Sequence, residues 1–315
     1  MAWTSAGRSI FAFALVSTLL SVVAVTLRFV CRGRILRVLG PSDWFLLVTL
    51  MFAIANLCCI GIHVAIGLGR PLHEFPPDTR ELFVKLLYVS SLLVNCSLAL
   101  TKISVLLLFP DIFAIAWPRK ATYILLVLVT LFGAWAALSS ILACVPIEAF
   151  WKQDDPPVPG RRCIAGVPKW YADAVVNLVL DIAIFCLPLP VVWPMVLPWR
   201  QKIWLYFAFA LGLFVCLASG IRIDFIQGNG PGPKAGIALA YWLTAEINTS
   251  IVIACIPTLR PLVVRLCPRL LMDGGDDKTD STGEPSVRLI EPSRPPIDFT
   301  GMGRLRRLPE SQGRV

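Results

Sequence analysis

Three ionisable side chains lie deep within long apolar segments of the sequence. Lys102 lies within LALTKISVLLLF, Asp181 within NLVLDIAIFCLPLPVVW and Glu246 within AYWLTAEINTSIVIACI. A charge at the centre of a bilayer costs at least about 2.5–3.5 kcal/mol, so such groups face the interior of a helix bundle and usually pair. An ion pair, a ligand site or a proton relay would all require the helices that carry these groups to meet.

The depths of the three groups in their segments make this meeting possible. At a helical rise of about 1.5 Å per residue, Lys102 lies about 10 Å from one end of its segment, and Asp181 and Glu246 lie about 15 Å from the corresponding ends. A lysine side chain spans about 6 Å and points towards the N-terminus of its helix. Lys102 is therefore predicted to reach Asp181, Glu246 or both, with Asp181 the expected partner. Asn177 and Trp242, each one turn from one of these acids, are predicted to line the same interior.

Different functions of this polar cluster remain open. It forms either an interhelical clasp that only stabilises the bundle, or a ligand or proton-relay site with the same lining. A carboxyl group in apolar surroundings could also act as a proton donor. Asp181 or Glu246 would then serve a membrane-embedded, acid-initiated cyclase.

The composition around these residues is that of a multi-spanning membrane protein. The chain has 315 residues, of which 57% are hydrophobic and 16% charged, and its mean hydropathy is +0.73. Soluble domains are closer to ~45–50% apolar and ~25% charged. The apolar residues occur in blocks of about twenty, the helical length that crosses a bilayer. The sequence therefore predicts an all-α membrane protein.

Seven such blocks predict a seven-transmembrane helix bundle over residues 9–270. To within a few residues they are 10–30, 44–68, 86–109, 122–143, 170–192, 203–221 and 237–256. Ser42 or Asp43 is well placed to cap the second helix. A short basic amphipathic stretch is expected after Ile256. Residues 271–315 are rich in Gly, Asp, Pro, Ser and Arg and are predicted to form a disordered cytosolic tail.

Lysines and arginines beside the segments predict the orientation. They are in excess at the end that includes the arginines after Ile256, which favours a cytosolic C-terminus and an outer or lumenal N-terminus, in the plasma membrane or an endomembrane. The net charge of +9 is attributed to topology and lipid headgroups. No nucleic-acid partner is predicted. The expected partners are membrane lipids, an apolar small-molecule ligand and a cytosolic signalling partner.

Three of the ten cysteines are candidates for modification. Cys144 and Cys163 bracket a polar loop on the outer face, where disulfides form. A bridge across about 20 residues would contribute ~3 kcal/mol in the chain-entropy model; two unrelated thiols are the alternative. Cys267 lies among arginines just past the last segment and is a candidate for palmitoylation, with an unmodified thiol as the alternative.

Several other patterns bear on cofactors and packing. The two histidines, His63 and His73, have no paired ligand spacing, so no metal site is predicted. Retinal proteins need a lysine in the seventh helix, and residues 237–256 contain none, so no cofactor is predicted. Gly133 and Ala137 form a small-xxx-small pair, which predicts a close helix-packing face.

A set of motifs occurs in a fixed order along the chain. They are SDW and GLGR around the second segment, LALTKISVLLLF, the C-x-P…FW…C loop, NLVLDIAIFCLPLPVVW, RQKIWLYFAFALG with ASGIRI, and W-x-x-x-E followed by ACIPTLRPL. Over roughly residues 9–270 this order resembles the fungal rhodopsin-domain family of integral membrane proteins. The family pattern falls on Asp43, Lys102, Cys144, Cys163, Asp181, Pro188, Pro190, Lys202, Arg222, Trp242, Glu246, Pro257 and Pro261.

The resemblance implies two classes of function. The family includes receptor-like surface proteins and members encoded in secondary-metabolite gene clusters, such as that for satratoxin. This short chain resembles the second type, which implies an accessory role in a biosynthetic pathway and an apolar small molecule handled in the helix bundle. A G-protein-coupled-receptor-like sensor is the alternative. The short N-terminus counts against it, as do Pro110 and Asp111, which stand where the family has an aromatic and a basic residue.

Overall fold

The computed structural model describes residues 5–69, 74–112, 116–152, 162–164, 166–192, 210, 212–221 and 233–266. The chain divides into two units, Met1–Asp273 and Gly274–Val315, and every described residue belongs to the first. The predictions for Cys267, for the tail 271–315 and for most of the sixth segment's first half therefore lie outside the described residues.

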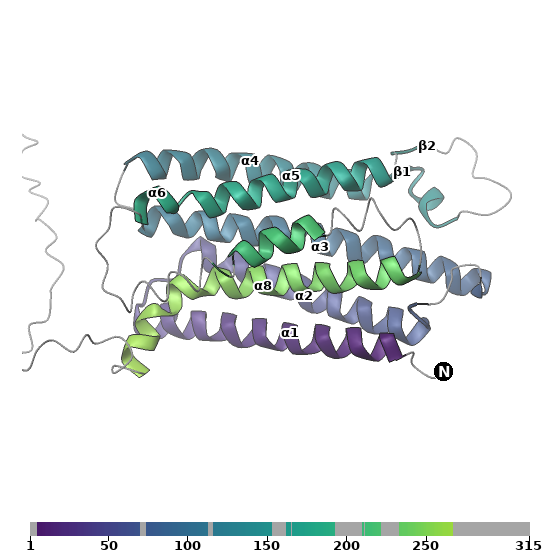
Figure 1. Ribbon diagram of the computed structural model, residues 1–315, viewed down its shortest axis with the longest axis horizontal. Helices are drawn as coiled ribbons and strands as arrows, with labels where there is room; N and C mark the ends of the chain where they lie inside the picture. The colour runs from purple at the N-terminus through teal and green to yellow at the C-terminus, as the bar shows by residue number, and fades with distance from the viewer. Residues whose placement is uncertain are drawn as a thin grey trace, which may run out of the picture. The chain divides into compact units, whose positions relative to one another are not determined.

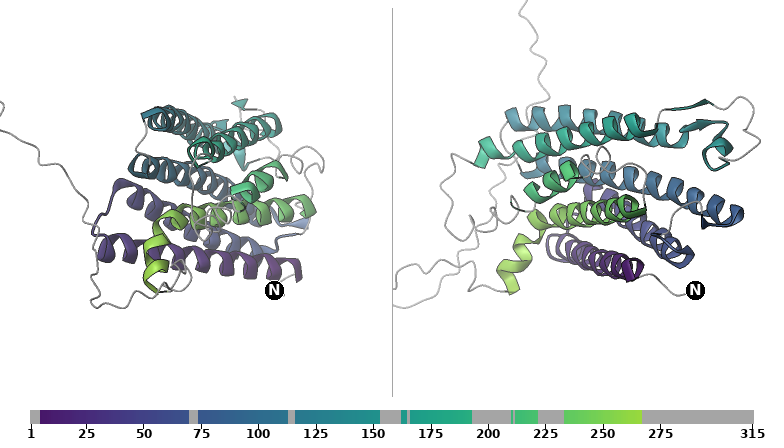
Figure 2. Two further views of the ribbon diagram at one scale, coloured as in Figure 1. Left: turned by 60° about the vertical axis from the view of Figure 1, so that its left-hand side comes forward. Right: turned by 45° about the vertical axis from the view of Figure 1, so that its right-hand side comes forward.

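Long helices make up most of the described chain (Figures 1 and 2). They are α1 (Ser5–Phe29), α2 (Pro41–Ile66), α3 (Pro77–Ile112), α4 (Ala116–Ile141), α5 (Gly166–Cys186), the four-residue α6 (Leu189–Val192) and α8 (Pro233–Leu266), and residues 212–221 are also helical. The π-helix η1 (Val30–Ile35) continues α1, and the 3₁₀-helix η3 (Ile147–Phe150) follows α4. Strands β1 (Cys144–Val145) and β2 (Arg162–Cys163) pair antiparallel. The predicted all-α membrane bundle is confirmed.

Five of the described helices are long and apolar enough to cross a membrane. They are Gly7–Ile35, Pro41–Ile66, Pro77–Pro110, Trp117–Ile141 and Ile237–Leu259. The fifth predicted segment corresponds to α5, whose 21 residues include Lys169, Asp173 and Asp181. The described part of the sixth is the shorter apolar helix Gly212–Ile221.

Helix α4 shows how the bundle meets lipid. Leu131 and Trp135 are 64% and 59% exposed, and Trp117 at the other end of the helix is 62% exposed. Such an apolar surface would be unfavourable in water but suits a hydrocarbon environment. The two tryptophans lie about 27 Å apart at helical rise, close to the ~30 Å hydrocarbon thickness whose interfaces tryptophan favours.

Three apolar clusters hold the described helices together, one of them between α1, α2 and α3 around Ile10, Ile60 and Phe83. The largest joins α1, α2, α3 and α8, with Leu46, Ile247 and Ile251 at its centre. A smaller one joins α3, α4 and α5 through Leu106, Val129 and Leu180. Figure 1 shows α8 lying alongside α1, with α4 and α5 side by side above α3.

Three predicted boundaries need correction. Helix α2 begins at Pro41, three residues before the predicted segment, and its N-cap is Gly40. Asp43 lies inside the first turn, where it stabilises the start of the helix by accepting a hydrogen bond from the Gly40 N–H at 3.0 Å. The fifth segment is not continuous: α5 ends at Cys186, and α6 begins at Leu189, because Pro188 cannot donate a helical hydrogen bond. The stretch after Ile256 is not separate, since α8 continues to Leu266.

The predicted close packing at Gly133 is confirmed. A Cβ atom placed on Gly133 of α4 would lie 2.8 Å from the Cβ of Ala99 on α3. Real Cβ contacts are longer than this, so even one methyl group would push the two helices apart.

Replacing Gly133 with alanine is expected to lower the melting temperature of the purified protein in detergent. The gain in helix propensity is at most about 1 kcal/mol, whereas overpacking a tight contact costs about 1–3 kcal/mol. The matched control is Gly220→Ala, since a Cβ there meets nothing within 4 Å. The double variant Gly133→Ala, Ala99→Gly should recover stability. A Gly133→Ala protein as stable as the control would refute the packing argument.

Candidate functional site

Lys102, from the middle of α3, is buried against α5. Its side chain is 9% exposed, and Nζ lies 3.2 Å from Oδ1 of Asp181, whose side chain is 11% exposed. The ammonium group also donates to the side-chain oxygen of Asn177 and, at 3.3 Å, to its backbone carbonyl. The expected partner, Asp181, is therefore the residue that pairs with Lys102.

Glu246 joins the same cluster without an ion pair to Lys102 among the described contacts. It is fully buried on α8, and its Oε1 accepts hydrogen bonds from Asn177 Nδ2 at 3.0 Å and from Ser219 Oγ at 2.8 Å. The same two residues donate to Oδ2 of Asp181, at 3.1 and 3.3 Å. We call these five residues, Lys102, Asn177, Asp181, Ser219 and Glu246, the central polar cluster.

The central polar cluster draws on four helices. Asn177 connects all three charged groups, because its amide accepts from Lys102 and donates to both acids. Ser219, on the helix Gly212–Ile221, was not predicted. A serine in an apolar segment gives no signal by itself. Trp242 is half-buried on α8, one turn from Glu246, and no hydrogen bond joins it to the cluster in the described part of the chain.

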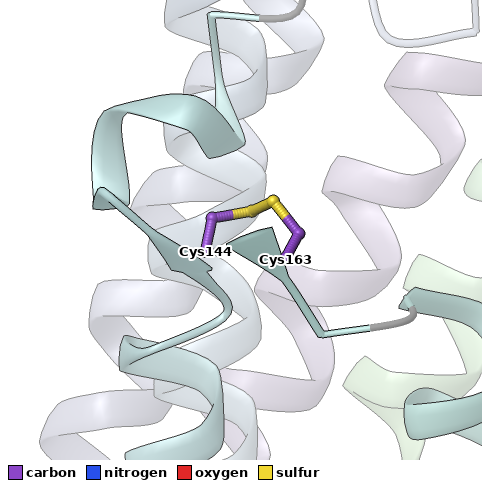
Figure 3. Close-up of a disulfide and its surroundings, with 2 residues drawn as sticks. All are labelled: Cys144 and Cys163. Carbon is purple, nitrogen blue, oxygen red and sulfur yellow. A yellow bond between two sulfur atoms is a disulfide. The ribbon is translucent and has the colours of Figure 1, made fainter. Parts of the chain in front are cut away.

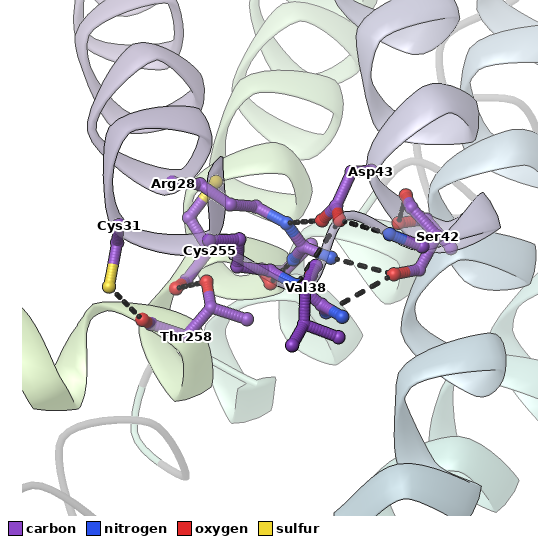
Figure 4. Close-up of polar contacts among 11 residues, drawn as sticks. Arg28, Cys31, Val38, Ser42, Asp43, Cys255 and Thr258 are labelled. Carbon is purple, nitrogen blue, oxygen red and sulfur yellow. Dashed lines mark hydrogen bonds and ion pairs between the residues drawn. The ribbon is translucent and has the colours of Figure 1, made fainter. Parts of the chain in front are cut away.

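A second buried charge cluster, which the sequence reasoning missed, joins α1, η1, α2 and α8 (Figure 4). Arg28 and Asp43 are both fully buried, and Arg28 Nε lies 2.8 Å from Asp43 Oδ1. Arg32 Nε lies 3.1 Å from Oδ2 of the same carboxylate. Arg28 also donates to Ser42 Oγ at 3.1 Å and to the backbone carbonyl of Ala254. We call this set the arginine clamp.

The sequence did contain signals for the arginine clamp. Arg28 and Arg32 lie one turn apart at the end of the first segment, and Asp43 lies among the residues of the family pattern. By their positions in the sequence, the two arginines are predicted to be loop charges that favour one orientation, and Asp43 is predicted to cap a helix. Because Arg28 is fully buried, it contributes to the packing of α1 on α2 and α8 rather than to a charged loop surface.

The opposite end of the bundle carries the disulfide (Figure 3). Cys144 and Cys163 are bonded, as predicted, with their Cα atoms 4.0 Å apart and directly opposite in the β1–β2 pair. The Ile164 N–H donates to the Ala143 carbonyl at 2.9 Å and extends this pairing. On η3 nearby, the exposed Glu148 accepts a hydrogen bond of 2.6 Å from Lys152, and this bond together with the positive charge of Lys152 lowers the pKa of Glu148.

Lys102→Met is expected to destabilise the folded protein by about 3–5 kcal/mol, because it leaves the carboxylate of Asp181 buried without its cation. Adding Asp181→Asn should recover most of the folded yield, measured by size-exclusion chromatography in detergent. Adding Glu246→Gln instead should recover much less. Lys85→Met is the control, since its ion pair with Glu81 is 46% and 35% exposed and contributes at most ~1 kcal/mol. Equal rescue by both second substitutions would contradict the assignment of Asp181 as the partner.

The bond between Cys144 and Cys163 should be present in protein expressed through the secretory pathway. Peptide maps with and without reductant should show one linked peptide pair, and Cys144→Ala, Cys163→Ala should lose about 3 kcal/mol of stability for a loop of this length. Cys58→Ala, a change at an exposed free cysteine, is the control. Two thiols that alkylate without reduction would show that the bridge does not form.

Comparisons with known proteins give three informative relatives. A Gibberella zeae protein named "Fugralins biosynthesis cluster protein 2" is 31% identical over 137 residues, covering 42% of this chain and 31% of that protein. "Receptor GIN3" of Arthrobotrys oligospora is 26% identical over 81% of this chain and 62% of its own. "Polyenoic acids biosynthesis gene cluster protein Ba17b" of Metarhizium anisopliae is 25% identical over 90% of this chain and 81% of its own.

This chain therefore matches only 31% and 62% of the lengths of the first two relatives. No solved structure matches the chain. The model of the fungal rhodopsin domain matches residues 27–265, which include the arginine clamp, the central polar cluster and the disulfide. This chain therefore belongs to the fungal rhodopsin domain family of membrane proteins.

Proposed function

We propose that this protein is an accessory membrane component of a secondary-metabolite pathway and handles an apolar small molecule within its helix bundle. The observation that carries the proposal is the central polar cluster, in which Lys102, Asp181 and Glu246 from three helices converge through Asn177. Relatives named as biosynthesis cluster proteins, including one matched over 90% of this chain, support the pathway role.

The chemistry of the cluster suits a mostly apolar molecule with a polar group. Such a molecule partitions into the bilayer and reaches the bundle from lipid. Once there, hydrogen bonds to its polar group are favourable because water does not compete inside the membrane. The side chains of Asn177 and Ser219 can form hydrogen bonds with a ligand, while the Lys102–Asp181 ion pair remains intact. The two opposite charges of that pair then stay together.

The arrangement of the helices supports seven spans. Helix α1 runs parallel to α8, since Ser21 contacts Asn248 and Cys31 contacts Thr258. Helix α5 begins at the disulfide end, directly after β2, and α8 also begins at that end, where Ile237 packs near Gly69. We therefore propose a further crossing between α5 and α8, and the described helix Gly212–Ile221, which lies in that interval, supports it.

The proposed orientation keeps the N-terminus outside or lumenal and the C-terminus cytosolic. The disulfide supports it, because Cys144–Cys163 then faces an oxidising compartment. The proposal includes no retinal, since a Schiff base needs a lysine in the last span, and Ile237–Leu259 contains none. The acid-initiated cyclase remains a prediction without added support.

A receptor-like sensor is the second candidate. It is favoured by the similarity to "Receptor GIN3", which extends over 81% of this chain. Both candidates require ligand contact with the bundle, but they differ in output. An accessory protein changes where a metabolite goes, whereas a sensor changes a cytosolic response.

The test is deletion of the gene in its native host, with metabolites profiled in cells and medium by mass spectrometry. An accessory role predicts that at least one apolar metabolite shifts between cells and medium. The wild-type gene should restore the profile, and a stably expressed Asn177→Leu variant should not. The matched control is Asn95→Leu, which removes a hydrogen bond to Ser140 outside the cluster. An unchanged profile with an altered transcriptional response would favour the sensor and overturn the accessory role.

A further inference from the structure

A cavity of about 240 Å³ lies beneath the disulfide, away from the central polar cluster. Tyr88 of α3, Phe150 of η3 and Trp170 of α5 give it aromatic walls, Ala143, Ile164 and the two cysteines also line it, and one side is open to the surroundings. An apolar cavity of about 150 Å³ holds benzene. This larger one has room for a molecule on the order of ten heavy atoms.

The hydroxyl groups at the cavity wall already donate hydrogen bonds to backbone carbonyls of the protein. Tyr88 donates to the Ile141 carbonyl at 2.8 Å, Ser91 to the Tyr88 carbonyl at 2.8 Å and Ser140 to the Ala136 carbonyl at 2.7 Å. These groups can offer a ligand only lone pairs. A ligand acceptor must therefore find its donor elsewhere in the wall.

Lys169, which also lines the cavity, is the candidate for that donor. Its side chain is 10% exposed, and Nζ lies 2.8 Å from Oδ2 of Asp173. An ammonium group has three N–H donors, so the contact with Asp173 leaves donors for a ligand. Because Asp173 already neutralises the charge, a neutral carbonyl is a better partner than a second carboxylate.

We propose that this cavity is a binding site for a small aromatic ketone, aldehyde or ester, whose ring lies among Tyr88, Phe150 and Trp170 and whose carbonyl accepts a hydrogen bond from Lys169. Ligand can enter past the hairpin, where Ile164 and Trp170 are 45% and 49% exposed. The disulfide keeps this wall in place, since it ties β2 and Ile164 to the end of α4. The pathway origin of the ligand rests on the proposed function, but the binding itself does not.

The test uses full-length protein in lipid nanodiscs and measures binding of 2-acetylnaphthalene by equilibrium dialysis against empty nanodiscs. Wild-type protein should bind it saturably. It should bind 2-ethylnaphthalene, which has the same size and no carbonyl, about ten- to a hundredfold more weakly, the range for a hydrogen bond to a charged group. 2-Naphthoate should also bind more weakly than the ketone. No saturable binding of the ketone, equal binding of the hydrocarbon or tighter binding of the acid would overturn the proposal.

Variants locate the site. Lys169→Met, Asp173→Asn removes the donor and its counter-ion together and should weaken ketone binding to the level of the hydrocarbon. The control is Lys152→Met, Glu148→Gln, which removes an exposed pair of the same i,i+4 spacing and should bind normally. Ala143→Leu should abolish binding by filling the cavity. Normal binding by both cavity variants would refute the site. The metabolite profile after gene deletion is a separate measurement, so either proposal can fail alone.

Discussion

A charge buried in a membrane bundle needs a partner within reach, and this requirement fixes how the helices are arranged. Arg28 and Asp43 are both fully buried and join α1 to α2. Lys102 and Asp181 join α3 to α5. Separating either pair would expose an unpaired charge to hydrocarbon, at a cost of several kcal/mol. Apolar packing allows one helix to slide along another, whereas these ion pairs hold each helix at one depth in the membrane. The central polar cluster therefore keeps its geometry.

The sequence predicted the central polar cluster better than the arginine clamp for a physical reason. Lys102, Asp181 and Glu246 each interrupt an apolar run. The sequence therefore indicates that burying these charges is costly, and it allows their depths along the predicted helices to be compared. Arg28 and Arg32 lie near the end of such a run, where charged side chains usually extend to the interface. Only the packing of α8 against α1 shows that this end is covered, and a contact between residues about 226 positions apart leaves no local pattern. Ser219 was missed for the same reason.

Prolines illustrate why helix boundaries could not all be predicted. Helix α5 ends two residues before Pro188, yet α8 continues through Pro257 and Pro261. A proline removes a helical hydrogen bond in either case. Near Pro257, α1 and η1 hold α8 in place from the side, since Arg28 donates to the Ala254 carbonyl and Cys31 donates to the Thr258 carbonyl. Neighbouring helices and hydroxyl side chains are what allow a membrane helix to keep a proline, and only tertiary structure shows whether they are present.

The cavity beneath the disulfide and the central polar cluster share two helices. Ser91 and Lys102 lie on α3, and Trp170 and Asp181 lie on α5. Each pair is separated by eleven residues, about 16 Å at helical rise, and both helices begin at the disulfide end. The two sites therefore stand at matching depths along the same pair of helices. A small change in the spacing of α3 and α5 would act on both, because the Lys102–Asp181 pair and the aromatic walls depend on that spacing. The disulfide ties the start of α5 to the end of α4, and the Lys102–Asp181 ion pair joins α5 to α3 further along, so α5 is held by its neighbours at the level of both sites.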